Sequence, residues 1–310
     1  MVGRQRRPTS TSPVPVVTVG AMSAVSPVSV VIAAHDEEAV IGHTLDTLLA
    51  GAAPGELDVV VAANGCRDRT VQVAEQRPGV TVVEVARASK THALNVAERL
   101  ATGFPRIYLD ADIAVPVTAV RALRAALEGP DAPLVAVPAR HLETRGRPWP
   151  VRGYTAIHRR LPAFEEGLFG RGMIAVSEAG RARFDVFPDV VADDLFLDSL
   201  FGPAERVQVR EVTTTVQTPL RTADLRRRLA RVRRGNAALR AGSGGAVAPV
   251  RDADRWSWLR DVVVPRPWLA PAALVYVALS ARAALEARRQ RGAAAPAWGH
   301  DESTRTLRAG

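Results

Sequence analysis

Short apolar runs alternate with segments of helical periodicity through the first half of the chain, and this alternation constrains the fold more than any other feature. The runs predict strands at 28–34, 57–63, 80–85, 107–109 and 134–138, and the segments between them predict helices at 40–49, 70–76, 93–100 and 117–127. The runs are continuous rather than alternately apolar and polar, which is typical of strands buried on both faces. The sequence therefore predicts an α/β fold with a doubly wound, mostly parallel sheet and helices on both faces.

Beyond residue 140 the alternation is weaker. We expect a loop at 142–150, a helix at 152–164, a short strand at 173–176 and a strongly basic helix at 222–240. Residues 241–257 are a predicted linker, because the first ten of them are rich in Gly and Ala. The chain ends, 1–26 and 293–310, are expected to be disordered tails.

The composition favours anionic partners. The 310 residues include 41 Lys and Arg against 32 Asp and Glu, which gives a net charge of +9. Such an excess suits nucleotide phosphates, lipid headgroups or nucleic acid, and it does not choose among them. Cys66 is the single cysteine, so an intrachain disulfide is excluded.

One apolar run near the C-terminus leaves two interpretations open. Residues 268–281 are uninterrupted by charge but shorter than the roughly 20 residues that a membrane-spanning helix needs. Arginines bound the run on both sides, so 258–292 is an apolar and basic helical segment that suits a helix lying in a headgroup region. A helix packed on the core of the protein explains the same pattern equally well.

The tripeptide Asp110-Ala111-Asp112 directly follows the predicted strand at 107–109. Two carboxylates in apolar surroundings need a compensating partner, and a hard divalent cation with oxygen ligands is a common one. At the carboxyl end of a buried strand, the pair opens onto the crevice where α/β sheets bind ligands. Taken alone, however, the two aspartates could simply cap a turn.

Four further segments, together with this tripeptide, resemble the motifs of a family 2 glycosyltransferase, the GT-A type that uses a nucleotide-diphosphate sugar. The resemblance covers residues 28 to about 236. It is carried by the strand and turn at 28–38, by Ala63-Asn64-Gly65-Cys66-Arg67-Asp68-Arg69-Thr70, by Lys90 ahead of Ala93-Leu94-Asn95, by Tyr108-Leu109-Asp110-Ala111-Asp112, and by Pro188-Asp189-Val190-Val191-Ala192-Asp193-Asp194-Leu195.

This resemblance implies a set of site residues. Asp112, with Asp110, would hold Mn²⁺ or Mg²⁺, and Asp194 would be the catalytic base, with Asp193 as the alternative. The implied donor-binding residues are Ala34, His35, Glu37, Asn64, Lys90, Asp110 and Arg231.

The chain also departs from the family pattern. His35 stands where an aromatic residue is usual, Asn64 where an acid usually reads the base, and Asp193 where Glu is usual. The segment 228–235 only faintly resembles the Gln-x-x-Arg-Trp motif of processive members, because both Gln and Trp are missing. This difference favours the addition of one sugar over polymerisation.

The implied function is inverting, metal-dependent transfer of one sugar from a nucleotide-diphosphate donor to a hydroxyl of a sugar, lipid or small-molecule acceptor, such as a cell-envelope glycan. The catalytic domain would cover 27–240, with a nucleotide-sugar half at 27–138 and an acceptor half at 139–240. We expect a cytoplasmic enzyme, with contact to the inner face of the membrane left open, and no nucleic-acid partner. The competing hypotheses are a nucleotidyltransferase of the same fold and a non-catalytic protein that binds nucleic acid or anionic membranes.

Overall fold

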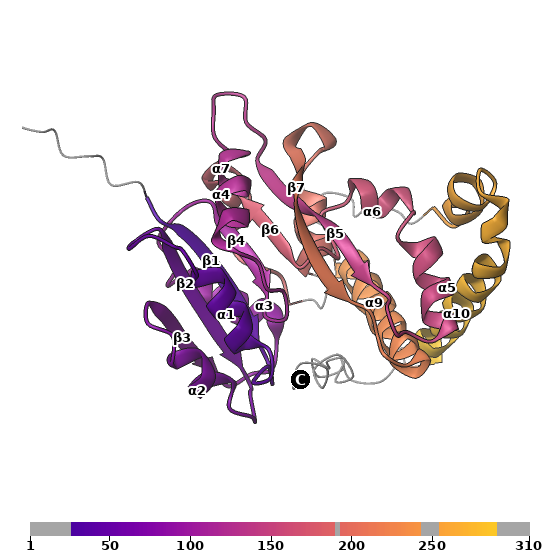
Figure 1. Cartoon of the computed structure of the whole chain (residues 1–310), viewed down its shortest axis with the longest axis horizontal. Helices are drawn as coiled ribbons and strands as arrows, with labels where there is room; N and C mark the ends of the chain where they lie inside the picture. The colour runs from indigo at the N-terminus through magenta and orange to yellow at the C-terminus, as the bar shows by residue number, and fades with distance from the viewer. Residues whose placement is uncertain (1–25, 190–192, 243–253, 290–310) are drawn as a thin grey trace, which may run out of the picture.

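The protein is described by a computed structural model that covers residues 26–189, 193–242 and 254–289. Its strands are β1 (Val28–Ala34), β2 (Leu57–Asn64), β3 (Val80–Val85), β4 (Arg106–Asp110), β5 (Val135–Glu143), β6 (Met173–Val176) and β7 (Arg206–Gln217). They form one sheet in the order β3-β2-β1-β4-β6-β5-β7 (Figure 1). The predicted tail at 293–310, nearly all of the tail at 1–26, most of the linker at 241–257 and the motif residues 190–192 lie outside the described residues.

The direction of the strands creates the edge at which the motifs meet. β1 pairs in parallel with both β2 and β4, so the strand order reverses between β1 and β4. β6 is antiparallel to β4 and β5, whereas β7 is parallel to β5. The prediction of a mostly parallel sheet is thus confirmed, and the ends of β1 and β4 form the type of switch point where α/β sheets bind ligands.

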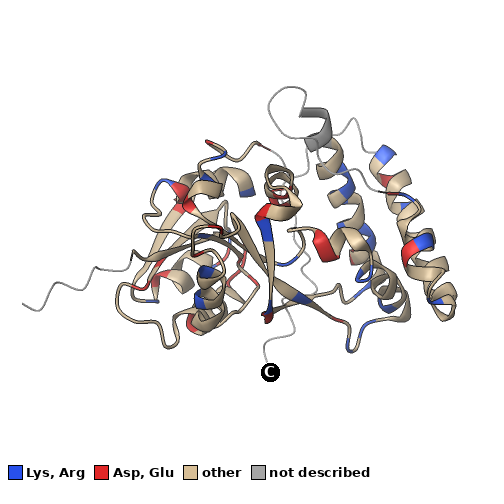
Figure 2. Cartoon of the chain, turned by 90° about the horizontal axis from the view of Figure 1, so that it is seen from above, with Lys and Arg blue, Asp and Glu red and all other residues tan. Residues whose placement is uncertain are grey.

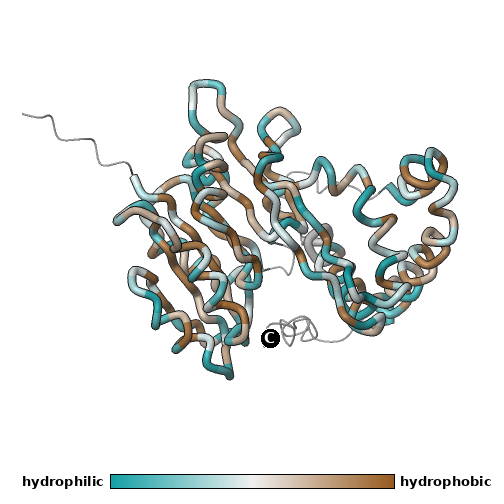
Figure 3. The backbone as a smooth tube through the Cα atoms, viewed as in Figure 1, coloured by the Kyte–Doolittle hydropathy of each residue, from teal (hydrophilic) through white to brown (hydrophobic). Residues whose placement is uncertain are grey.

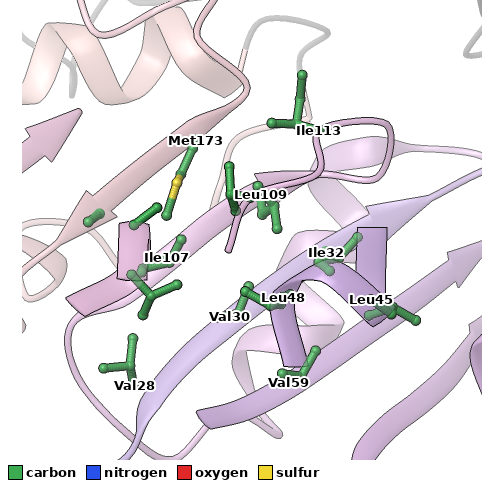
Figure 4. Close-up of a cluster of buried hydrophobic side chains, with 14 of the residues drawn as sticks. Val28, Val30, Ile32, Leu45, Leu48, Val59, Ile107, Leu109, Ile113 and Met173 are labelled. Carbon is green, nitrogen blue, oxygen red and sulfur yellow. The ribbon is translucent and has the colours of Figure 1, made fainter. Parts of the chain in front are cut away.

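Helices cover both faces of the sheet, as predicted. They are α1 (Ile41–Leu49), α2 (Thr70–Glu75), α3 (Lys90–Glu98), α4 (Val117–Ala125), α7 (Glu178–Arg181) and α8 (Asp193–Leu200). Successive residues of a strand point to opposite faces. Val30 and Ile32 therefore pack with α1 and α4 (Figure 4), whereas Val31 and Ala33 pack with α3 and α8. The apolar colouring of the central strands in Figure 3 reflects this burial on both sides.

A helical layer lies beyond β5 and β7, at the end of the molecule farthest from β3 (Figure 1). It consists of α5 (Trp149–His158), α6 (Pro162–Glu166), α9 (Thr222–Gly242), the π-helical turn η2 (Trp258–Val263), the 3-10 turn η3 (Pro267–Leu269) and α10 (Ala270–Arg289); a further 3-10 turn, η1 (Pro203–Glu205), precedes β7. The rings of Tyr154 in α5 and Tyr276 in α10 stack with their centroids 5.1 Å apart.

The apolar run at 268–281 has one side that packs on the protein and another that is exposed. The first side fits a helix packed on the core, and the second fits a helix lying in a headgroup region. Ala273 and Leu279 are buried against the neighbouring helices, whereas Trp268 and Leu274 are 72% and 75% exposed. By length and composition the helical stretch Pro267–Arg289 is long and apolar enough to cross a membrane. In the fold, however, its inner face packs on α5 and α9.

Three sequence-based predictions in the second half were wrong or incomplete. The loop expected at 142–150 begins late, because β5 continues through Glu143, and the helix expected at 152–164 is divided into α5 and α6. β7 was not predicted. It lies at the edge of the sheet and alternates buried Val212 and Thr214 with exposed residues, so it has no continuous apolar run.

Candidate active site

The Asp110-Ala111-Asp112 segment is held in place through its backbone. The Asp110 N–H donates to the Gly172 carbonyl oxygen at 2.9 Å, and the buried Thr44 hydroxyl of α1 donates to the Ala111 carbonyl oxygen at 2.8 Å. Ala111 is buried, and Asp112 is exposed. The segment therefore lies at the carboxyl edge of the sheet, with Asp112 exposed there.

Lys90 connects two of the motifs. It is the first residue of α3, and its Nζ lies 2.8 Å from Asp110 Oδ1 and 2.9 Å from Asp193 Oδ2. Burial opposes the charge on Lys90, but the two carboxylates outweigh it and raise the Lys90 pKa above its usual range. Burial likewise favours protonation of Asp110, but the Lys90 ammonium outweighs it and the pKa of Asp110 is lowered. Lys90, Asp110 and Asp193 thus form one charged cluster.

Asp194 lies in the first turn of α8, beside this cluster. Its Oδ2 accepts a hydrogen bond from the Gly170 N–H at 3.0 Å, and its Oδ1 accepts one from the Leu195 N–H at 2.8 Å. Burial, followed by repulsion from the Asp193 carboxylate, raises the pKa of Asp194 to about 6. A carboxylate with such a pKa is ionised at neutral pH and can still accept a proton from a hydroxyl.

A pocket of about 630 Å³ opens at the ends of β1 and β2. His35, Asp36, Gly65 and Cys66 contribute to its wall, together with Glu84, Val85 and Ala88 from the β3 side. His35 Nδ1 lies 2.6 Å from the Asn64 carbonyl oxygen, to which it donates, and this contact fixes the ring beside the pocket. The size and position of the pocket suit a nucleoside.

Three other predicted donor residues, Ala34, Glu37 and Asn64, are buried next to residues of the pocket wall and do not line it, whereas Arg231 lies on α9. Asn64 is fully buried, and its Oδ1 accepts a hydrogen bond from the Ser89 N–H at 2.9 Å, so it fixes the start of α3. Ala34 and Glu37 are buried as well, and the Glu37 N–H donates to Thr70 Oγ1 at 2.7 Å. Direct contact of these side chains with a base stays a prediction.

Two residues that sequence reasoning did not single out also act on the site. Arg228 of α9 contributes to lowering the pKa of Asp110, whereas the residue predicted on this helix was Arg231. Thr44 holds Ala111 from α1. A threonine on a buried helix face gives no sequence signal of that role, because its partner is a backbone carbonyl distant in the chain.

A second group of metal-binding atoms lies in the wall of the pocket. His35, Asp36 and Cys66 each place a ligand atom within 4.8 Å of the others. Nitrogen and sulfur ligands suit Zn²⁺, whereas the oxygen ligands of Asp110 and Asp112 suit Mg²⁺ or Mn²⁺. The two groups of ligand atoms therefore suit different metal ions.

Comparison with known proteins identifies the family of one segment of the chain. Residues 29–180 match the glycosyl transferase family 2. The matched segment contains β2 to β4 and nearly all of β1, with His35, Asn64, Lys90 and Asp110, and it ends before Asp193 and Asp194. This segment of the chain belongs to this family of glycosyltransferases. No curated protein matches the chain.

Solved structures of GT-A glycosyltransferases share the fold. A mannosyltransferase from Pyrobaculum calidifontis in complex with GDP-Man and Mn²⁺ is 23% identical, with a TM-score of 0.53, over 86% of this chain and 80% of that one. Glucosyl-3-phosphoglycerate synthase from Mycobacterium tuberculosis, in complex with Mn²⁺, UDP and glucosyl-3-phosphoglycerate, is 19% identical, with a TM-score of 0.51, over 74% of this chain and 82% of that one.

Proposed function

We propose that this glycosyltransferase moves one sugar from a nucleotide-diphosphate donor to an acceptor hydroxyl, with inversion at the anomeric carbon. The observation that carries the proposal is the meeting of Lys90, Asp110, Asp193 and Asp194 at the strand-order reversal, beside a pocket of nucleoside size. In this proposal residues 27–138 bind the donor and residues 139–240 the acceptor, in the cytoplasm.

The residues of the chain divide the chemistry between them. The acceptor oxygen bonds to the anomeric carbon as the bond from that carbon to the diphosphate oxygen breaks. The hydroxyl proton passes to Asp194, and the electron pair leaves with the nucleoside diphosphate. One base without a separate enzyme nucleophile implies a single displacement, which inverts the configuration.

The carboxylates at the end of β4 fit a divalent cation. Asp112, with Asp110, offers the oxygen ligands that Mn²⁺ and Mg²⁺ prefer. Such an ion, when bound, stabilises the charge that gathers on the departing diphosphate. Lys90 contributes a further positive charge beside the same group, because its two carboxylate partners keep it protonated.

Donor binding can be tested without knowing the acceptor. We expect one nucleotide sugar, among those carrying UDP, GDP or other bases, to raise the melting temperature of the protein in Mn²⁺. A ligand at 100 times its Kd stabilises the native state by about 2.7 kcal/mol. Chelation with EDTA should remove most of this shift. A shift that is equal with and without EDTA, or no shift for any nucleotide sugar, contradicts the proposal.

We also propose that the outer face of α10 contacts an anionic membrane. Pro271, Leu274, Ala278, Ala281 and Leu285 follow helical spacing and are exposed on one side of α10, with Trp268 ahead of them. Exposed arginines end the helix, and basic residues recur along this helical end of the molecule (Figure 2). An apolar stripe flanked by Trp and Arg suits the boundary between headgroups and acyl chains.

Replacing two leucines of this stripe should weaken membrane binding. We expect the Leu274→Gln, Leu285→Gln double variant to sediment about tenfold less with phosphatidylserine-containing vesicles, because it exposes polar groups to the acyl region. Leu100→Gln, which alters an exposed leucine at the end of α3, is the matched control. Equal sedimentation of the double variant and the control contradicts membrane contact through α10.

A further inference from the structure

Arg140 on β5 carries a charge that no acidic group of the described residues compensates. Its guanidinium lies 4.4 Å from the centroid of the Phe164 ring. Its Nη2 is buried, and it has no hydrogen-bond partner among the described residues. A charged donor that is removed from water without an acceptor is costly, so such a group is seldom left in place for stability alone.

The neighbouring Arg171 shows how a structural arginine is satisfied in the same region. Arg171 is 2% exposed, and its guanidinium donates only to backbone carbonyl oxygens, those of Pro138, Phe164, Glu165 and Gly167, at 2.8–3.0 Å. Arg171 therefore has acceptors in the fold itself. Arg140 has no such acceptor among the residues that the structure describes, which indicates that its acceptor comes from a bound molecule.

The groups around Arg140 are positive or neutral. Burial, and then the charges of Arg171 and Arg228, lower the pKa of Arg140 to about 10, so it remains charged at neutral pH. The rings of His158 and Phe164 lie 4.1 Å apart, and burial together with Arg140 and Arg228 lowers the pKa of His158 well below its usual range. The imidazole is therefore neutral, and the charges that act on the pKa of Arg140 are positive.

Arg140 lies near Asp194, the proposed general base. The Gly170 N–H that donates to Asp194 belongs to a residue where a Cβ would lie 3.2 Å from Arg140 Nη1. An anion held by Arg140 would consequently lie close to the hydroxyl that Asp194 deprotonates.

We propose that Arg140 binds an anionic group of the acceptor, a phosphate or a carboxylate, beside Asp194. This inference rests on the proposed glycosyl transfer, and it narrows the acceptor to an alcohol that carries negative charge. A guanidinium matches both groups, because its planar fork donates two parallel hydrogen bonds to their oxygens. The diphosphate of the donor is the other anion that could meet Arg140, so the test separates the two.

The test uses inorganic phosphate as the probe and the full chain as the protein. Phosphate binding is measured by calorimetry in Mn²⁺, first without nucleotide and then with whichever of UDP and GDP stabilises the protein at saturation. The variants are Arg140→Met, which keeps an apolar stem on Phe164, and the control Arg145→Met, which alters an exposed arginine. Arg140→Lys, which keeps the charge but loses the fork, is the second variant.

We expect phosphate to bind in the presence of the nucleotide, and Arg140→Met to weaken this binding about 10- to 100-fold, as the loss of charge-assisted hydrogen bonds predicts. Arg145→Met should match the parent, and Arg140→Lys should fall between them. Arg140→Met should melt at or above the parent temperature, because it removes an uncompensated buried charge.

Two results overturn the inference: equal phosphate affinity in Arg140→Met, or displacement of phosphate by the nucleotide, which would assign Arg140 to the donor diphosphate. Phosphate binding that depends on Arg140 in a protein that binds no nucleotide or nucleotide sugar would support the anion site. It would also overturn the proposed donor, so the two failures are distinguishable.

Discussion

Asp112→Asn should lower the rate of sugar transfer by about 10³-fold, because it removes the carboxylate proposed to hold the divalent cation. Asp112 is exposed, so the substitution should change the free energy of unfolding by less than about 0.5 kcal/mol. Donor consumption at saturating Mn²⁺, followed for the variant and the parent, measures the effect.

The matched control is Asp131→Asn. Asp131 is an exposed aspartate in the loop that leads to the amino end of β5, on the edge of the sheet opposite the site. It should retain the parent rate and the parent dependence on Mn²⁺. Full activity of Asp112→Asn at the metal concentration that saturates the parent would contradict the metal assignment.

Asp194→Asn should lower the rate by about 10²- to 10⁴-fold, the range typical of a lost general base. The amide keeps the shape of the side chain and can accept one of the Gly170 and Leu195 hydrogen bonds, which go to different carboxylate oxygens of Asp194, but it cannot take a proton. The rate of the parent should rise with pH through about 6 and then level off, because the base acts in its ionised form and the pKa of Asp194 is raised to about 6.

Stability distinguishes loss of the base from loss of the fold. A carboxyl whose pKa is higher in the folded than in the unfolded protein makes folding less favourable as pH rises from its ordinary value of 3.8 towards 6. Asp194→Asn removes this effect, so the free energy of unfolding of the variant should fall less than that of the parent as the pH rises from 3.8 to 6. A variant that keeps its activity, or an unchanged pH profile in Asp194→Asn, would assign the proton transfer to another group, with Asp193 the first alternative.

The local parts of the fold were predictable because each is encoded in a short stretch of sequence. The continuous apolar runs predicted β1 to β4, and the helical spacing of apolar residues predicted α1 and α4. The position of Asp110-Ala111-Asp112 at the end of a buried strand followed directly, since the three residues before it, Ile107, Tyr108 and Leu109, form a short apolar run. The family resemblance supplied the functional meaning of these positions.

The parts that depend on contacts between distant residues could not be predicted. Lys90 lies between Asp110 and Asp193 only because α3, β4 and α8 converge, and no spacing in the chain indicates that bridge. The uncompensated charge of Arg140 is likewise visible only once β5, α6 and α9 are placed together.

Anomalous diffraction at the manganese absorption edge, from crystals grown with Mn²⁺ and the nucleotide sugar that stabilises the protein, tests the central claim most directly. We predict a manganese peak in contact with the Asp112 carboxylate and the donor diphosphate, with Asp194 facing the anomeric carbon. A peak at His35, Asp36 and Cys66 instead, or an Asp194 side chain turned away from the sugar, would contradict the account.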